Sequence, residues 1–327
     1  MVVLAFVLEC AAVGALVTGA SSLVVFALSL LLREMAKALS SSRKADLALL
    51  LSTAPALTTL GVVVAISLPP IVNALGSRAD DCSSHSHHGH FCLVHSGAPG
   101  PALMVLGAAA LALFAIRALL AAGRLGRSAS NVALLETLGQ VEQSRFPIVW
   151  LPGAPRLCLA TGILRRRILI STSLGEELGR LQLEAALAHE QAHLRRQDPL
   201  ASLSVQLGGL FALPFIAGHL ACEHAAFTEE ACDQEAARAV GEPVIVAEAL
   251  VKVASLASQR GPALAFGVGV LEARVHALLR LSLADPIPVR RPMLIAATVG
   301  LLSTLSVVLG ASGVVHHAVE TLLQGFL

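Results

Sequence analysis

Residues 189–193 read His-Glu-Gln-Ala-His and carry the side chains best suited to chemistry in this chain. On a helix, His189 and His193 are four residues apart and project from the same face. Two imidazoles placed in this way can hold one zinc ion, and Glu190 beside them can act as a general base toward water. The preceding segment, 181–187, contains only Leu, Ala, Gln and Glu, which favour the helix that this arrangement needs.

A second acidic motif can complete this site. Catalytic zinc generally takes three protein ligands, so a third ligand is expected on a neighbouring helix. Residues 229–233 read Glu-Glu-Ala-Cys-Asp, which places Glu229 and Asp233 one helical turn apart on one face. Glu229 can bind the metal, while Asp233 can accept a hydrogen bond from the outer nitrogen of a liganding histidine.

Other residues near this motif are alternative third ligands. Glu230 is the nearest competitor, although it projects about 100° away from Glu229 on a helix. Cys232 is expected to pack as a small buried residue, and a thiol ligand at this position is the less favoured alternative. Further candidates are His219, Glu223 and His224.

The composition places these residues in a mainly α-helical membrane protein. The 327-residue chain is 55% hydrophobic and 14% charged, whereas soluble domains carry about 25% charged residues. Four segments are long and apolar enough to cross about 30 Å of hydrocarbon as helices; they are residues 2–32, 47–75, 101–122 and 293–312. The net charge is +1 and the chain has no basic tract, so we expect no direct binding of nucleic acid.

Basic residues between the spans predict their orientation in a bacterial cytoplasmic membrane. They follow the first and third spans and precede the fourth, as Arg33, Lys37, Arg43, Lys44, Arg117, Arg124, Arg127, Arg290 and Arg291. By the positive-inside rule, these segments are cytoplasmic. The amino terminus, the 76–100 loop and the tail after residue 312 are then expected outside.

The predicted outer loop, 76–100, is rich in possible metal ligands. It contains Cys82, Cys92 and the histidines at 85, 87, 88, 90 and 95. On the outer side, Cys82 and Cys92 can form a disulfide that closes a short loop. A metal-sensing or metal-collecting loop is the functional alternative, but a His-rich tract is only a compositional signal. We therefore favour a solvated connector.

The sequence divides into three parts. Residues 1–122 and 293–327 are the predicted membrane parts, and residues 123–292 form the predicted zinc domain. Three β-like runs at 146–151, 156–160 and 167–172 predict a small sheet. Helices are expected from about 174 to 198, as one helix or two broken near Gly179, and then over 223–240, 243–259 and 270–283. The apolar run 200–222 is expected to be a membrane-dipping hairpin or a buried helix pair, because a full crossing would separate the predicted zinc ligands.

The combined motifs resemble the membrane-embedded metallopeptidases of the BlaR/MecR family. The resemblance is carried by HExxH followed by Glu-x-x-Cys-Asp, and by the block from Leu159 to Asp198 that leads into HExxH. The chain is more distantly similar to the HtpX and CAAX-prenyl-protease zinc proteases. The resemblance implies a zincin-like α+β domain at the cytoplasmic face, with Zn²⁺ bound by His189, His193 and Glu229, and with Glu190 as the base. We take Asp233 as the supporting residue.

The sequence therefore predicts a membrane-integrated zinc endopeptidase that acts on a cytoplasmic or membrane-associated protein. A transcriptional repressor is a candidate substrate by family analogy. The strand at 167–172 is expected to bind the substrate by edge addition. Receptors of the BlaR/MecR family carry a penicillin-binding sensor domain outside the membrane. The tail expected after residue 312 is too short for such a domain. We therefore expect no β-lactam sensing by this chain. The alternatives are a non-catalytic zinc-containing sensor or scaffold, and a metal transporter.

Overall fold

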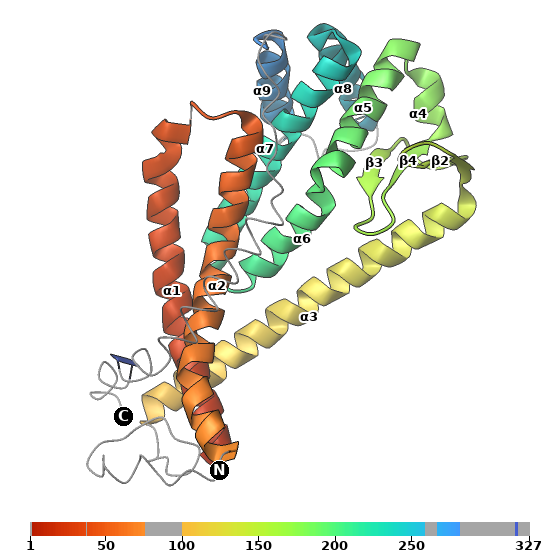
Figure 1. The fold of residues 1–327 in the computed structure, drawn as a ribbon. Coiled ribbons are helices and arrows are strands. Elements are labelled where there is room, and N and C mark those ends of the chain that lie inside the picture. The colour runs from red at the N-terminus through yellow and green to blue at the C-terminus, as the bar shows by residue number, and fades with distance from the viewer. Residues whose placement is uncertain (1, 37, 76–99, 259–266, 282–317, 320–327) are drawn as a thin grey trace.

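The fold was analysed in a computed structural model, which describes residues 2–36, 38–75, 100–258, 267–281 and 318–319 (Figure 1). Three long helices come first: α1 Val2–Ala36, α2 Ser41–Leu75 and α3 Pro101–Leu138. A four-stranded sheet and six further helices follow within the described residues. The predicted fourth span at 293–312 lies outside the described residues, as do Cys82, Cys92 and the histidines of the predicted outer loop.

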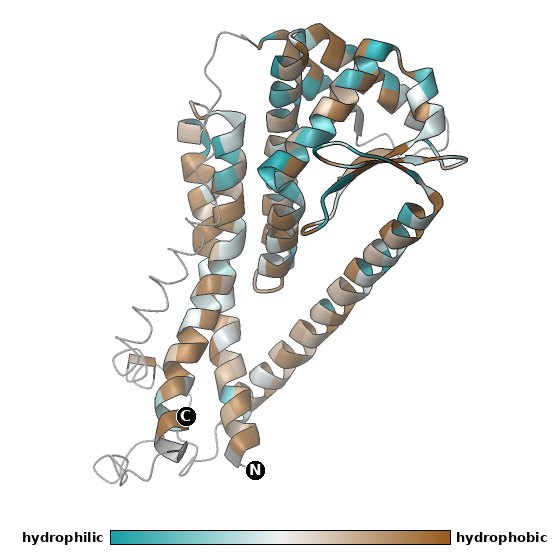
Figure 2. Ribbon diagram, turned by 45° about the vertical axis from the view of Figure 1, so that its right-hand side comes forward, coloured by the Kyte–Doolittle hydropathy of each residue, from teal (hydrophilic) through white to brown (hydrophobic). Residues whose placement is uncertain are grey.

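The three long helices contain the first three predicted spans. Segments Val3–Ala36, Ser41–Val72 and Pro101–Leu138 are long and apolar enough to cross a membrane. Apolar residues dominate these helices, whereas hydrophilic residues gather at the end that carries the sheet and the shorter helices (Figure 2). Where α3 crosses α1, a Cβ on Gly107 would lie 2.0 Å from the Leu8 carbonyl oxygen, so glycine permits this close contact.

Helix α3 extends beyond the predicted end of its span at residue 122. No proline follows Pro101 in this helix, so nothing removes a backbone hydrogen bond before its end. The helix ends at Gly139, whose backbone is extended with φ −94° and ψ 159°. The first sixteen or so residues assigned to the domain by the sequence are therefore the end of α3, which carries the chain directly to the sheet (Figure 1).

The sheet contains β1 Gln140–Glu142, β2 Ile148–Leu151, β3 Cys158–Thr161 and β4 Arg167–Ser171, in the order β1-β2-β4-β3. β2 and β4 are parallel, and the other pairs are antiparallel. β4 is hydrogen-bonded on both sides and is almost fully buried. The expectation that the strand at 167–172 binds a substrate by edge addition is therefore wrong, because both of its edges are occupied. β3 is the free edge strand on this side of the sheet.

The remaining helices are α4 Thr172–Glu177, α5 Arg180–Arg196, α6 Asp198–Gly209, α7 Pro214–Val240, α8 Pro243–Ser258 and α9 Gly267–Leu279. Of these helices, α4 and α5 pack against the sheet, and the others pack against α5 or against one another. The helical conformation is interrupted between α4 and α5 at Gly179, which has an extended backbone and is the N-cap of α5. Small buried side chains, Ala185 and Ala188 on α5 and Ala236 and Ala237 on α7, share one core cluster with α8 and α9. Their size lets α5 and α7 approach closely, and these two helices carry the predicted metal ligands.

The apolar run 200–222 forms a helix pair, consisting of most of α6, a turn and the first part of α7. This α6–α7 hairpin packs against α2. A Cβ on Gly208 would lie 2.7 Å from the Ser52 carbonyl oxygen, so this glycine permits the contact. At the tip, Arg117 of α3 donates to the carbonyls of Gly209 and of Ala212, the latter at 2.8 Å. The hairpin thereby joins the long helices to the rest of the domain.

Candidate metal centre and active-site cleft

Helix α5 presents His189 and His193 on one face. Their ring centroids are 4.8 Å apart, and their Nε2 atoms are separated by 3.1 Å. The helix is capped at its start, where the Gly179 N–H donates to Gln182 Oε1 at 3.2 Å. It ends at Gln197, which adopts the left-handed conformation with φ 61°. This turn starts α6 immediately, so Asp198 returns toward the last turn of α5.

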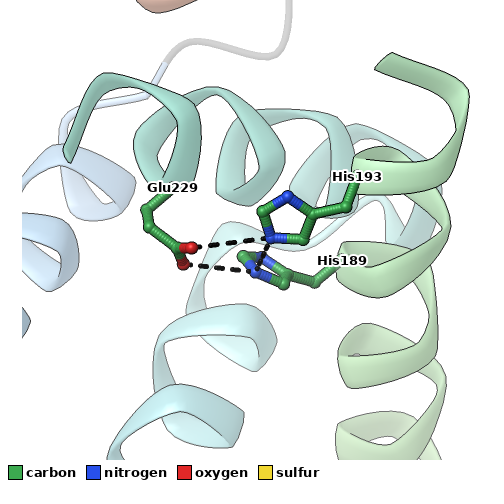
Figure 3. A group of neighbouring side chains, drawn as sticks. All are labelled: His189, His193 and Glu229. Atoms are coloured by element: carbon green, nitrogen blue, oxygen red, sulfur yellow. Dashed lines mark hydrogen bonds and ion pairs between the residues drawn. The ribbon is translucent and has the colours of Figure 1, made fainter. Parts of the chain in front are cut away.

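Helix α7 brings Glu229 to the two histidines (Figure 3). Its Oε2 lies 3.5 Å from His189 Nε2, and its Oε1 lies 3.6 Å from His193 Nε2. For a tetrahedral zinc ion with metal–ligand distances near 2.1 Å, ligand atoms are separated by about 3.4 Å. The three separations therefore fit one zinc ion between these side chains.

The charges at this point also suit a divalent cation. Burial alone would raise the pKa of Glu229, but hydrogen bonding from His189 and the charges of Arg274 and the two histidines lower it to about 2. Glu229 is therefore an anion at neutral pH. Burial would lower the pKa of His189, yet Asp233 and Glu229 raise it to about 10. The same carboxylates that favour a proton on His189 would favour a metal cation in its place. Two imidazole nitrogens and one carboxylate are ligands that zinc prefers.

Each histidine also contacts its own carboxylate through the outer ring nitrogen. His189 Nδ1 lies 2.9 Å from Asp233 Oδ1, and His193 Nδ1 lies 3.0 Å from Asp198 Oδ2. Such contacts orient liganding imidazoles and hold their inner nitrogens available for a metal. Asp233 was expected in this position, whereas Asp198 was not singled out. The sequence shows only that Asp198 follows His193 by five residues. The contact also requires the left-handed turn at Gln197, which is not evident from the sequence.

Arg274 on α9 was also missed by the sequence analysis. It donates to Asp233 through two nitrogens at 2.7 and 2.8 Å, and its Nη1 lies 3.0 Å from Glu229 Oε2. Burial favours the protonated form of Asp233, but the hydrogen bonds from Arg274 and His189 hold its pKa below the ordinary value. Nothing near Arg274 in the sequence predicts this role, because α9 is separated from α7 by the whole of α8.

Cys232 contacts both His193 and the carboxylate of Asp198. Its Sγ lies 3.3 Å from His193 Nδ1 and 3.3 Å from Asp198 Oδ2, so His193, Asp198 and Cys232 form a second group of possible metal ligands. Burial, together with Asp198, raises the pKa of the Cys232 thiol well above its ordinary value. A protonated thiol is a weak hydrogen-bond donor and a poor metal ligand. We therefore assign this group to positioning His193.

Glu190 points from α5 toward the sheet. Its Oε2 accepts a hydrogen bond from the Ala160 N–H of β3 at 2.5 Å. Burial raises the pKa of the Glu190 carboxyl, and the charges of His189 and His193 oppose this shift. A carboxylate with a raised pKa, held beside a metal site, is suited to exchange protons with water near neutral pH.

A cleft of about 540 Å³ opens over these residues. The cleft is lined by β3, α5, α6 and α7, and α5 contacts both β3 and α7. Its lining includes Cys158, Leu159, Ala160, His189, Glu190, His193, Ser202, Gln206, Ala221, His224, Ala225, Thr228 and Glu229. The possible zinc ligands and Glu190 therefore face a space that is large enough for a segment of a peptide.

The alternative third ligands do not join the two histidines in a possible metal site. Glu230 Oε1 accepts hydrogen bonds from Ser41 at 2.6 Å and Gln234 at 3.4 Å, beside the start of α2. Glu223 lies 3.6 Å from His219 on the same helix. His224 is buried and lines the cleft. In the part of the chain that the structure describes, none of these residues joins His189 and His193 in a group of possible metal ligands.

Comparison with known proteins supports a peptidase domain. Residues 159–272 match the model of Peptidase family M48. The matched region runs from β3 into α9 and includes His189, Glu190, His193 and Glu229, so it indicates a metallopeptidase domain. The match does not support the more specific assignment to the BlaR/MecR type, which the motifs resemble. Comparison with curated proteins and with solved structures found no match.

Proposed function

We propose that this chain is a membrane-integrated zinc endopeptidase. The observation that carries the proposal is the geometry of His189, His193 and Glu229, whose ligand atoms are 3.1 to 3.6 Å apart. Glu190 lies beside them in the same cleft. The match to Peptidase family M48 over this region supports the same activity.

The chemistry follows from the positions of these side chains. A zinc ion held by His189, His193 and Glu229 would polarise the scissile carbonyl and lower the pKa of water toward about 7. The Glu190 carboxylate accepts a proton from the attacking water and delivers it to the leaving amine nitrogen. The Ala160 N–H holds Glu190 Oε2, which leaves Oε1 for this transfer. Asp233 and Asp198 keep the two imidazoles in place throughout.

We propose β3 as the strand that binds the substrate, in place of the strand at 167–172. The Ala160 N–H points to Glu190 and therefore away from β4. Leu157 and Ser171 hydrogen-bond each other on the β4 side. Because backbone groups alternate along a strand, the backbone N–H and carbonyl of Cys158 face the cleft together with the Ala160 carbonyl. An extended segment of a protein substrate can pair with these groups as an added strand.

We further propose that the active site lies at the cytoplasmic face. The α1–α2 connection and the domain lie at the same end of the long helices (Figure 1). Arg33, Arg43, Lys44, Arg124 and Arg127 belong to this end, as the positive-inside rule requires of a cytoplasmic side. The substrate is then a cytoplasmic or membrane-associated protein, and a cognate repressor is a candidate from the resemblance. An epitope inserted at exposed Ser144 should react with antibody only in permeabilised cells, and reaction in intact spheroplasts would contradict this orientation.

Glu190→Gln in the full chain, purified in detergent, tests the enzymatic proposal. The substitution keeps the size of the side chain but removes the proton acceptor. We expect zinc to stay near one ion per chain, while cleavage of a quenched-fluorescent peptide library falls by at least about a hundredfold, as expected for loss of a general base. Exposed Glu184→Gln on the same helix is the matched control and should keep full activity.

The outcome also separates the competing functions. A non-catalytic sensor or scaffold would bind zinc without needing Glu190, so neither the native chain nor the variant would cleave any peptide. The Glu190 carboxylate, which lines the cleft at hydrogen-bonding distance from the edge strand, favours the enzyme. Equal cleavage by the native chain and Glu190→Gln would show that Glu190 is not the base.

A further inference from the structure

The hydroxyl of Thr228 is buried in the active-site cleft without a hydrogen-bond partner. The residue is only 5% exposed, and its Oγ1 makes no hydrogen bond to any described residue. Thr228 lines the cleft on α7, directly before the possible zinc ligand Glu229. A buried hydroxyl without a partner is unfavourable for folding, so its presence in a cleft calls for a ligand.

Other hydroxyls on the helices of this protein behave differently. Ser52, Thr58 and Ser204 each donate to the backbone carbonyl four residues earlier, at 2.7, 2.9 and 3.0 Å. This local bond is the usual way in which Ser and Thr satisfy their hydroxyl within a helix. Thr228 could reach the His224 carbonyl in the same way, but its hydroxyl makes no such bond. Its hydroxyl is therefore available to a ligand in the cleft.

The position of Thr228 suits contact with a peptide. β3, with the backbone groups of Cys158 and Ala160, lines the cleft together with α7, and both elements pack against α5. Ala221 and Ala225 precede Thr228 on the same side of α7, and their small side chains leave room beside the hydroxyl. A peptide that pairs with β3 along one edge keeps backbone donors and acceptors free along its other edge, which faces α7.

We propose that the Thr228 hydroxyl binds the substrate by a hydrogen bond to the peptide on the α7 side of the cleft. This inference rests on the proposed peptidase function. Thr228 is a substrate-binding residue in this assignment, and it neither binds the metal nor transfers a proton. A peptide in the cleft would give this buried hydroxyl a hydrogen-bond partner.

Thr228→Val and Thr228→Ser in the zinc-loaded full chain test this role. Valine has nearly the same shape without the hydroxyl, and serine keeps the hydroxyl. The probes are two peptidyl hydroxamates, one extending to each side of the metal position, and acetohydroxamate, which carries the zinc-binding group without a peptide. We expect Thr228→Val to weaken at least one peptidyl hydroxamate about three- to tenfold, as expected for loss of one neutral hydrogen bond. Thr228→Ser should bind it within about twofold of the native chain.

Two further measurements exclude a purely structural role. Thr228→Val should keep its zinc content and its affinity for acetohydroxamate, and its unfolding temperature without a ligand should be unchanged or higher, because the unpaired hydroxyl is gone. Unchanged binding of both peptidyl hydroxamates, or a lower unfolding temperature with weaker acetohydroxamate binding, would overturn the proposal. If the native chain binds neither zinc nor any hydroxamate, the peptidase function itself fails, which is a different result.

Discussion

The two histidines of the candidate metal centre are supported by different parts of the molecule. His189 contacts Asp233, which is held by two hydrogen bonds from Arg274, so its support comes from α7 and α9 within the domain. His193 contacts Asp198 at the start of α6, and Arg196 beside it donates to Asp198 at 3.3 Å and to Ser42 at 2.8 Å. Ser42 belongs to the first turn of α2, which is a candidate membrane span.

This difference shows that the support of His189 lies within the domain alone, whereas the support of His193 is connected to the candidate membrane span α2. Asp233 is 1% exposed and has a charged partner with two hydrogen bonds, so the support of His189 is rigid and strongly charged. Asp198 shares a single oxygen among His193, Arg196 and Cys232. We infer that the support of His193 is weaker and that it depends on how α2 packs against the domain.

Removal of Arg274 should have the largest effect. Arg274→Met leaves Asp233 and Glu229 without their cationic partner, and a buried charge that loses its partner costs about 3–5 kcal/mol. The pKa of Asp233 should also rise, because Arg274 now holds it low. Unfolding in detergent should show this loss of stability, together with a loss of zinc. Exposed Arg280→Met is the control, and equal stability of the two variants would mean that Arg274 is not a support of His189.

Asp233→Asn and Asp198→Asn compare the two supports directly. Loss of a carboxylate behind a liganding histidine typically lowers metal affinity about 10- to 100-fold. We expect Asp233→Asn near the upper end of this range and Asp198→Asn near the lower end, because Asp233 carries the stronger charge network. Competition with a chromophoric zinc chelator measures both affinities. A greater loss for Asp198→Asn would reverse the comparison.

Ser42→Ala should have the smallest effect and tests the connection to the candidate membrane span α2. It removes a hydrogen bond to a charged guanidinium, which is worth about 1.5–3 kcal/mol, although Arg196 keeps its contact with Asp198. We expect a drop of about 1.5–2 kcal/mol in the free energy of unfolding, in the lower part of that range. Zinc affinity should fall only slightly. Ser67→Ala, which removes an exposed local bond on the same helix, should change neither quantity. No change in stability for Ser42→Ala would remove the proposed connection.

Much of the candidate site followed from local spacing. A separation of four residues places His189 with His193, and Glu229 with Asp233, on common helix faces, because a helix repeats every 3.6 residues. The apolar segments and the break near Gly179 are likewise local properties. The exposed, three-residue β1 carried too little pattern to be predicted. The predicted third span ends at residue 122, but α3 continues to Leu138. Hydropathy falls after residue 122, which ends the apolar segment without ending the helix.

The sequence by itself determined the chemistry that this chain can support: the possible zinc ligands, the candidate base, and the apolar helices around them. Only the tertiary structure decided which strand is free at the cleft, that Arg274 and Asp198 support the histidines, and that Thr228 lacks a partner. The physical reason is that spacing along one element follows from backbone geometry, whereas contacts between elements depend on how sheet order, helix packing and one left-handed turn combine distant parts of the chain.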